Sequence, residues 1–361
     1  MLSRVPVMTR SAMGCSSYCD HNHGRRYCGS MSTSEVVRSA GLRAHWHAVA
    51  NVDSLVGSPV GVRLLGDDYV LWRGPDGNVV AAPDSCPHRQ SPLSAGTIES
   101  GCLRCPYHGW LFGAEGVCQE VPSAAAGAPV PPRAHLETVY AAEKYGLVWI
   151  CPGEPAAPIP EVGEEDDSDF RRINTEVQVW KVAAPRMVDN FLDIAHFPFV
   201  HVGTFGGAQD PSVSPVELEE LEGGFFGYRY EIVAENPDEA RATSGSREPV
   251  VERAMSSGFR LPLTVRSTIA YRSGLRHILL LLSTPMDAES SYFTFVVWRN
   301  DDFDVPAEEV IAFDRAIGEE DRVMLERLDG EMPLDRTVLV SVQADKASVE
   351  WRRQFAELVR A

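Results

Sequence analysis

The segment Cys86–Trp110, CPHRQSPLSAGTIESGCLRCPYHGW, gathers three cysteines and two histidines within 25 residues. Two short boxes hold the possible metal ligands, Cys86-x-His88 and Cys105-x-x-His108. Structural zinc sites usually pair like with like, as C-x-x-C and H-x-H, whereas each box here is mixed. A disulfide between Cys102 and Cys105 fits their spacing, but nothing in the sequence favours an oxidising compartment.

A third arrangement fits the mixed boxes best. A Rieske [2Fe–2S] centre places two thiolates on one iron and two imidazoles on the other, so each box supplies one ligand to each iron. The sequence therefore predicts that the cluster is held by Cys86, His88, Cys105 and His108. Gly109 lets the backbone approach a sulfide closely, and Trp110 shields the cluster from water. Because imidazole ligands raise the reduction potential, such a centre accepts electrons from ferredoxin-like donors.

The composition excludes several classes of partner. The chain has 361 residues, enough for two domains, and its net charge of −18 argues against binding to nucleic acid or to anionic membranes. The longest apolar run, Ile278–Leu282, is far too short to span a bilayer. Eight unevenly spaced cysteines do not suggest a secreted disulfide scaffold, so we expect a cytoplasmic protein.

Changes in sequence character divide the chain into four parts. Residues 1–40 begin with a serine-rich stretch that has more arginine than acid and lacks the apolar core of a secretory signal, and we expect a disordered extension. A transit peptide, a small metal site or a true start at Met31 are the alternatives. Residues 41–152 alternate short apolar runs with turns, as at Gly74-Pro75-Asp76-Gly77, which is typical of antiparallel strands. Residues 153–169 are rich in proline, glycine and acid and are expected to be a linker.

Residues 170–361 are expected to form an α+β domain. A helical period begins at PRMVDNFLDIAHF, residues 185–197, and a terminal helix is expected from about Asp304. Between them, four runs predict strands: FFGYRYEIVAE, LTVRSTIAYRS, LRHILLLLSTP and SYFTFVVWRN. This order predicts a curved antiparallel sheet with helices packed on it.

A second group of possible metal ligands lies in VDNFLDIAHFPFVH, Val188–His201. Asn190, Asp193 and His196 are spaced by three and would share one face of a helix. Pro198 interrupts that helix, so the chain can bring His201 back beside His196. Two converging histidines suit a mononuclear metal, although buried core histidines are the alternative. A 2-His-1-carboxylate site needs an acid as well, and the residues alone leave several on the terminal helix in competition: Asp314, Glu319, Glu320 and Asp321.

Taken together, CPHR, CPYHGW and the N-x-x-D-x-x-H-x-x-x-x-H box resemble the α subunits of Rieske non-haem iron oxygenases. The similarity is greatest to the vanillate and dicamba O-demethylase and 3-ketosteroid hydroxylase group. Respiratory-chain Rieske proteins carry two further cysteines, and Ser91 and Tyr107 occupy the corresponding positions here. The resemblance implies an all-β Rieske domain followed by a helix-grip (START-like) catalytic domain.

The resemblance also assigns roles to the residues of the second group. It selects Asp321 as the third ligand of an Fe(II) ion, with His196 and His201. It implies that Asp193 bonds an iron-ligand histidine and bridges toward a Rieske histidine of a neighbouring subunit. Asn190 would line the active site near the iron.

The implied activity is that of an oxygenase component. It would use O2 and externally supplied electrons to hydroxylate or oxidatively demethylate a small or medium ring-containing substrate. No G-x-G-x-x-G fingerprint occurs, so NAD(P)H would act only through a separate reductase or ferredoxin. The family implies a homotrimer. The alternatives are a Rieske electron-transfer protein without oxygenase activity, and an oxidative cyclase or desaturase of the same fold.

Overall fold

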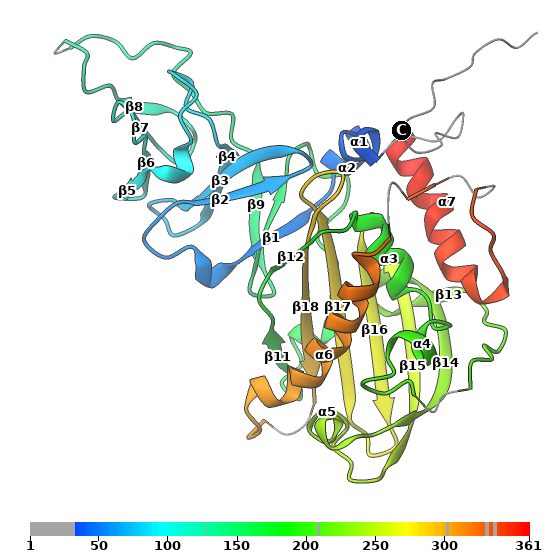
Figure 1. The fold of residues 1–361 in the computed structure, drawn as a ribbon. Helices are drawn as coiled ribbons and strands as arrows, with labels where there is room; N and C mark the ends of the chain where they lie inside the picture. Colours follow the sequence, from blue (N-terminus) through cyan, green and yellow to red (C-terminus); the bar gives the residue numbers. More distant parts are fainter. Residues whose placement is uncertain (1–32, 126, 208–209, 301–302, 329–331, 335–337) are drawn as a thin grey trace, which may run out of the picture.

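The structure is a computed structural model, and it describes residues 33–125, 127–207, 210–300, 303–328, 332–334 and 338–361. A smaller, strand-rich part precedes a larger part built on a single broad sheet (Figure 1). Within the described part of the chain, no helix has both the length and the apolar character needed to cross a bilayer.

Three small antiparallel sheets make up the first part. The first joins β1 (His47–Asn51), β10 (Leu147–Cys151) and β9 (Tyr140–Lys144), and the second joins β2 (Val60–Leu64), β3 (Asp67–Arg73) and β4 (Val79–Pro83). The third contains β5 (Thr97–Glu99), β6 (Cys102–Arg104), β7 (Leu111–Phe112) and β8 (Cys118–Glu120). The hairpin expected at Gly74–Gly77 is confirmed, because these residues lie in the turn between β3 and β4. The all-β prediction for this part is therefore confirmed.

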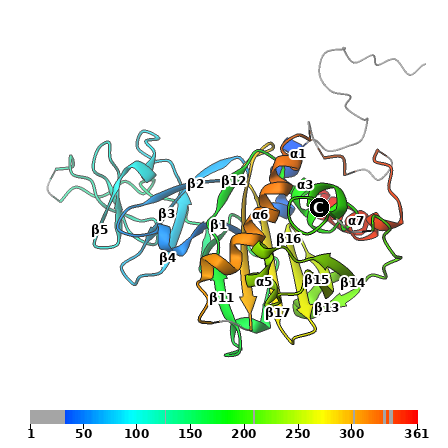
Figure 2. The same ribbon diagram turned by 60° about the horizontal axis from the view of Figure 1, so that its bottom comes forward.

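The second part is an eight-stranded antiparallel sheet with helices on one face (Figures 1 and 2). Its strands, in spatial order, are β11 (Arg171–Asn174), β18 (Ser291–Arg299), β17 (Arg276–Pro285), β16 (Thr264–Tyr271), β15 (Val250–Arg260), β14 (Phe225–Glu235) and β13 (Glu219–Leu221), with β12 (Gln178–Trp180) also paired to β18. The covering helices are α3 (Ala184–Phe191), α6 (Ala307–Leu325) and α7 (Lys346–Arg360). The predicted α+β class is confirmed. Strand β15 lies in a segment for which the sequence predicted no strand.

Successive side chains of the central strands point to opposite faces of this sheet, because the strands are pleated. Ile278 and Leu280 of β17 pack with Trp149 of β10, so one face rests on the first part of the molecule. Phe295 and Val297 of β18 pack with Val310 and Ile311 of α6 on the opposite face. Both faces are therefore buried, and the helix-covered face encloses the candidate active site.

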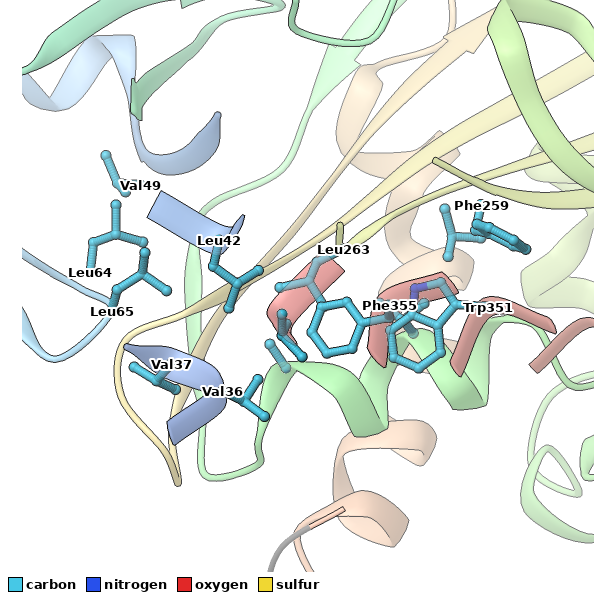
Figure 3. Close-up of a cluster of buried hydrophobic side chains, with 14 of the residues drawn as sticks. Val36, Val37, Leu42, Val49, Leu64, Leu65, Phe259, Leu263, Trp351 and Phe355 are labelled. Carbon is cyan, nitrogen blue, oxygen red and sulfur yellow. The ribbon is translucent and has the colours of Figure 1, made fainter. Parts of the chain in front are cut away.

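The expectation of disorder over residues 1–40 is wrong for residues 33–40. They form α1 (Thr33–Val37) and the start of α2 (Ala40–Arg43), and the Ser39 hydroxyl caps α2 by accepting from the Leu42 N–H at 3.3 Å. Val36 and Val37 are buried in one cluster with Trp351 and Phe355 of α7 (Figure 3). Two apolar side chains thus anchor the segment to the last helix. A transit peptide, a small metal site and a start at Met31 all concern residues 1–32, which lie outside the described residues.

The segment predicted to be a linker, residues 153–169, is packed against both parts. Ile159 and Val162 are buried in the cluster between the two sheets. The Tyr145 hydroxyl accepts from the Val162 N–H at 2.9 Å and donates to the Pro160 carbonyl at 2.9 Å. The segment has irregular backbone apart from one 3-10 turn at Gly163–Glu165. It is nevertheless packed in place, because its buried side chains and the Tyr145 hydrogen bonds hold it against the two sheets.

Candidate functional site

The two Cys/His boxes lie in two loops of equivalent conformation. In the first loop the Cys86 N–H donates to the Ser91 carbonyl at 2.9 Å, and the Gln90 N–H donates to the Cys86 carbonyl at 2.8 Å. In the second loop the Cys105 N–H donates to the Trp110 carbonyl at 2.9 Å, and the Gly109 N–H donates to the Cys105 carbonyl at 3.1 Å. The bonded residues are separated along the chain by the same number of positions in both loops. The fourth residue after each cysteine has left-handed backbone, Gln90 with φ 55° and Gly109 with φ 72°. Glycine adopts this conformation without strain, which gives Gly109 a definite role.

The side chains of the two boxes segregate by type. Cys86 and Cys105 are buried, 1% and 3% exposed, and both are free thiols, as is Cys102. The His88 and His108 rings are in contact, with centroids 4.4 Å apart, and His108 is exposed to solvent. Trp110 stacks on His88 at 4.6 Å with nearly parallel rings, as expected for a shielding residue.

These residues fit a [2Fe–2S] cluster with two thiolate and two imidazole ligands. The buried Nδ1 of His88 has no hydrogen-bond partner among the described residues, as expected of a nitrogen that binds metal. Burial raises the pKa of the Cys86 thiol to about 11, so this thiol ionises readily only beside a positive ion.

The second group of ligands forms at a break between two helices. Helix α3 ends at Phe191, so Asp193 and His196 lie beyond it, and the expectation that they share one helical face with Asn190 is wrong. The polypeptide turns instead, and Pro198 stands in the first turn of the short helix α4 (Phe197–Val200). That turn carries His201 back toward His196, as the sequence predicted.

Three ligand atoms converge at this break. The Nε2 atoms of His196 and His201 are 3.2 Å apart, and Oδ1 of Asp321 lies 3.5 Å from each of them. Two nitrogens bound about 2.1 Å from one ion at roughly right angles would be about 3.0 Å apart. His201 and Asp321 are 1% and 6% exposed. The arrangement therefore fits a single ion with one face left open for other ligands.

Each of the three ligand side chains is held by a further hydrogen bond. Nδ1 of His196 lies 3.0 Å from Oδ2 of Asp193, and the Asn190 amide donates to Oδ1 of Asp321 at 3.0 Å. Burial opposes the charged form of His196, but the Asp193 and Asp321 carboxylates outweigh it and raise the pKa of His196 to about 9. The structure thus brings both Asn190 and Asp193 to the triad.

Glu320 is a partner that the sequence did not reveal, because it was considered only as a rival for the third ligand position. Its Oε2 lies 3.0 Å from Nδ1 of His201 and accepts from the Thr204 hydroxyl at 2.7 Å. Its other oxygen accepts from the Gly203 N–H at 2.9 Å. Adjacent helical residues point about 100° apart, so only one of two neighbouring acids faces the ion directly.

The other acids considered for the third position lie elsewhere. Oδ2 of Asp314 is 3.1 Å from Nε2 of His277. Glu319 is on the surface, where it pairs with Arg322 at 2.6 Å. Neither carboxylate reaches the two imidazoles that Asp321 contacts.

A cavity extends from the triad between α6 and the sheet. Its volume, counted as the space open to the centre of a water-sized sphere, is about 120 Å³, and most of its wall is apolar. Representative lining residues are Phe197, Met255, Ile269, Leu281, Phe295 and Ile317. Such a site binds a compound with an apolar ring and leaves few positions for polar recognition.

Comparison with known proteins matches two parts of the chain to family models. Residues 45–139 match the Rieske [2Fe-2S] domain, and residues 180–361 match the vanillate O-demethylase oxygenase C-terminal domain. The methylxanthine N1-demethylase NdmA of Pseudomonas putida is 30% identical over 331 residues, 89% of this chain and 90% of its own. The oxygenase component of dicamba O-demethylase from Stenotrophomonas maltophilia is 33% identical over 189 residues, 50% of this chain and 53% of its own. The structure of NdmA with caffeine has a TM-score of 0.77 at 28% identity, covering 90% of this chain and 93% of that one.

Proposed function

The chain belongs to the Rieske non-haem iron oxygenases, and from this premise we propose that it oxidatively removes a methyl group from nitrogen or oxygen on a ring-containing substrate. One observation carries the proposal: the His196, His201 and Asp321 side chains converge at one end of a mostly apolar cavity. The curated relatives include both an N-demethylase and an O-demethylase, so the bond broken is C–N or C–O. A protein that only carried electrons would need neither the triad nor the cavity.

The proposed ligands are divided between the two centres. Cys86, His88, Cys105 and His108 would hold the cluster, and His196, His201 and Asp321 would hold the mononuclear iron. When bound, the two centres supply one-electron transfer and activation of O2. One oxygen atom then enters a methyl C–H bond and the other leaves as water, which consumes two electrons and two protons. The oxygenated carbon departs as formaldehyde.

The side chains of this protein place the reacting groups and exclude water. Hydrogen bonds at Nδ1 of His196 and His201 leave Nε2 of each ring for the metal. Asn190 fixes the carboxylate of Asp321 by donating to Oδ1. The apolar wall presents the methyl-bearing end of the ring to the triad and limits water beside it.

The electrons come from a separate reductase or ferredoxin, and we infer that they cross between subunits of a homotrimer. The Cys/His boxes lie beside β5–β8 at one end of the molecule, away from α4 and α6, which carry or flank the triad (Figure 1). A second depression, of about 290 Å³ on the same measure, reaches Asp193 from the protein surface and is bordered by Asp189, Val340 and Arg352. Leu328, Leu339 and Val340 all border this depression and are exposed, so its rim presents a contiguous apolar surface of the kind that another molecule covers. A cytoplasmic location, where such reductases operate, is part of the proposal.

Iron content and formaldehyde together test this function. We expect three irons per chain, and formaldehyde formed from methoxy- or N-methyl-substituted rings when NADH and a surrogate reductase are supplied. His201→Ala should retain the two cluster irons and lose formaldehyde formation. Two irons in the wild-type chain would rule out the oxygenase, and full turnover by His201→Ala would rule out the iron assignment.

A further inference from the structure

Arg253 differs from every other buried arginine in the described residues. Four arginines are buried, and three have acceptors: Arg266 pairs with Glu164 at 2.9 Å, Arg352 lies 3.2 Å from Asp189, and Arg299 donates to backbone carbonyls. Arg253 is 4% exposed, yet no carboxylate or carbonyl of the described residues accepts from its guanidinium. A guanidinium stays charged and carries five N–H donors, so burial without an acceptor is costly.

The side chain of Arg253 lines the cavity that leads to the triad. On β15, Arg253, Met255 and Ser257 alternate with residues of the opposite face, and all three border the cavity. The Cζ atom lies 5.5 Å from the centre of the Phe205 ring and 5.7 Å from that of Tyr271. These aromatic rings orient the guanidinium through cation–π contacts but accept no conventional hydrogen bond.

Phe205 links Arg253 to the iron ligands. Its ring stacks on that of His201 with centroids 5.0 Å apart and planes 23° apart. The 5.5 Å from Cζ of Arg253 to the Phe205 ring and the 5.0 Å from that ring to the His201 ring set an upper limit on the distance between the guanidinium and His201. A six-membered ring with substituents at both ends spans such a separation.

The charges around the cavity favour an anion beside Arg253. Asp314, an acid on the wall, has its Oδ2 3.1 Å from Nε2 of His277, and no ion pair joins it to Arg253 among the described residues. Asp193 and Asp321 also border the cavity, but they are engaged at the triad by His196 and Asn190. The buried charge of Arg253 therefore has no counter-ion among the side chains that the structure describes.

We propose that Arg253 binds an oxyanion on the substrate, a carboxylate or a sulfonate, and so turns the methyl-bearing end of the ring toward the triad. This inference rests on the proposed function, whose substrate class it narrows to ring acids. The planar fork of a guanidinium matches two oxyanion oxygens, and such charge-assisted pairs are strong when water is excluded. Uncharged substrates such as methylxanthines would leave the guanidinium unpaired.

The test compares acids with their uncharged amides in the reduced, iron-loaded enzyme under anaerobic conditions, where binding occurs without turnover. The probes are the three isomeric methoxybenzoates, the matching methoxybenzamides, 4-methoxybenzenesulfonate and caffeine, titrated by calorimetry. We expect at least one acid to bind 10-fold or more tightly than its amide. Arg253→Gln should weaken that acid 10- to 100-fold and leave the amide within 3-fold. Arg253→Lys should restore part of the preference.

The matched control is Arg272→Gln, which removes an exposed arginine close to the end of the neighbouring strand and should change neither affinity. Tighter binding of every amide or of caffeine would overturn the inference, and so would an equal loss of acid and amide in Arg253→Gln. If Arg253→Gln fails to fold, the affinities of the wild type and of Arg253→Lys for each acid and its amide still test whether Arg253 binds the oxyanion. Acid binding without formaldehyde under turnover would contradict the proposed function alone, whereas formaldehyde from uncharged ethers only would contradict the role of Arg253 alone.

Discussion

Two carboxylates outside the triad position its imidazoles. Asp193 and Glu320 each take the Nδ1 side of one imidazole, at 3.0 Å in both cases. A hydrogen bond from Nδ1–H fixes the tautomer whose Nε2 lone pair faces the ion, and it makes the ring a better ligand. The two acids come from different segments, Asp193 from the turn after α3 and Glu320 from α6. The ligand geometry therefore depends on the docking of α6 as well as on the local sequence.

Glu320→Ala should weaken the mononuclear iron site while sparing the cluster. Loss of such an outer hydrogen bond typically lowers metal affinity 10- to 100-fold, and Gly203 N–H and the Thr204 hydroxyl lose an acceptor as well. The measurement is iron retained after dialysis against a graded series of chelators, with cluster absorbance as the internal reference. Glu319→Ala is the control, because that neighbour pairs only with Arg322 on the surface. Equal iron retention in the two variants would show that Glu320 plays no part in holding His201.

At the scale of elements, the parts that sequence predicts well are those whose ligands are close along the chain. Both Cys/His boxes and the His196/His201 pair lie in short segments, so their spacing is enough to predict that they bind metal. Asp314 and Asp321 are seven residues apart and occupy the same face of α6, so periodicity does not separate them. The residues alone left four acids open, and the proposed choice of Asp321 depends on where α6 crosses the sheet.

Strand β15 escaped prediction because it forms part of the cavity wall. Its cavity-facing positions include Arg253 and Ser257, and Gly258 follows, so the usual alternation of apolar and polar residues is lost. The end of α3 was also misjudged, since the apolar period continues past Phe191 although the backbone turns. In both cases the periodicity of apolar residues predicts the secondary structure least well where the segment lines the cavity or carries the candidate ligands. The residue that we propose as decisive for substrate choice thus lies on the strand that was hardest to predict.

The junction between α2 and β1 should make stability depend on pH through His47. This imidazole is 3% exposed and its Nε2 contacts the Leu42 carbonyl at 2.9 Å, and burial lowers the pKa of His47 to about 4. The unfolded chain has a pKa of about 6.5 at this position, so it binds a proton first as pH falls. The contribution of neutral His47 to the free energy of unfolding is therefore fully present above about pH 6.5. It is lost between about pH 6.5 and 4, and the loss amounts to about 3 kcal/mol in total.

Urea unfolding at several pH values, followed by circular dichroism, measures this loss. His47→Gln retains a donor for the Leu42 carbonyl but cannot titrate, so its free energy of unfolding should vary less between pH 7 and 5 than that of the wild type. His135→Gln, at an exposed position, should keep the wild-type dependence. If His47→Gln and the wild type lose stability in parallel, the buried imidazole is not the source.

At the scale of the whole molecule, one core joins the two parts into a single unit. Val49 and Leu64 of the first part, Phe259 and Leu263 of the large sheet region, and Trp351 of α7 belong to the same buried cluster (Figure 3). The Cys/His boxes nevertheless project from one end, and the triad lies under α6 at a distance from them (Figure 1). A packed core keeps these positions fixed relative to each other, because interiors resist deformation. We therefore propose that the electrons arrive from a second chain, whose boxes reach the depression beside Asp193.

Mixed assemblies of two inactive variants test this arrangement. Cys86→Ala removes a cluster ligand and His201→Ala removes an iron ligand, so each variant alone should form no formaldehyde. When the two are co-expressed with different tags and purified through both, a cyclic trimer has one interface that joins an intact cluster to an intact iron site, and activity should be about a third of the wild-type value. Mixing the separately purified variants should give no activity unless subunits exchange. An inactive co-expressed assembly that contains both chains and its full complement of remaining iron would mean that electrons travel within one chain, and that the exposed Val340 region serves another purpose.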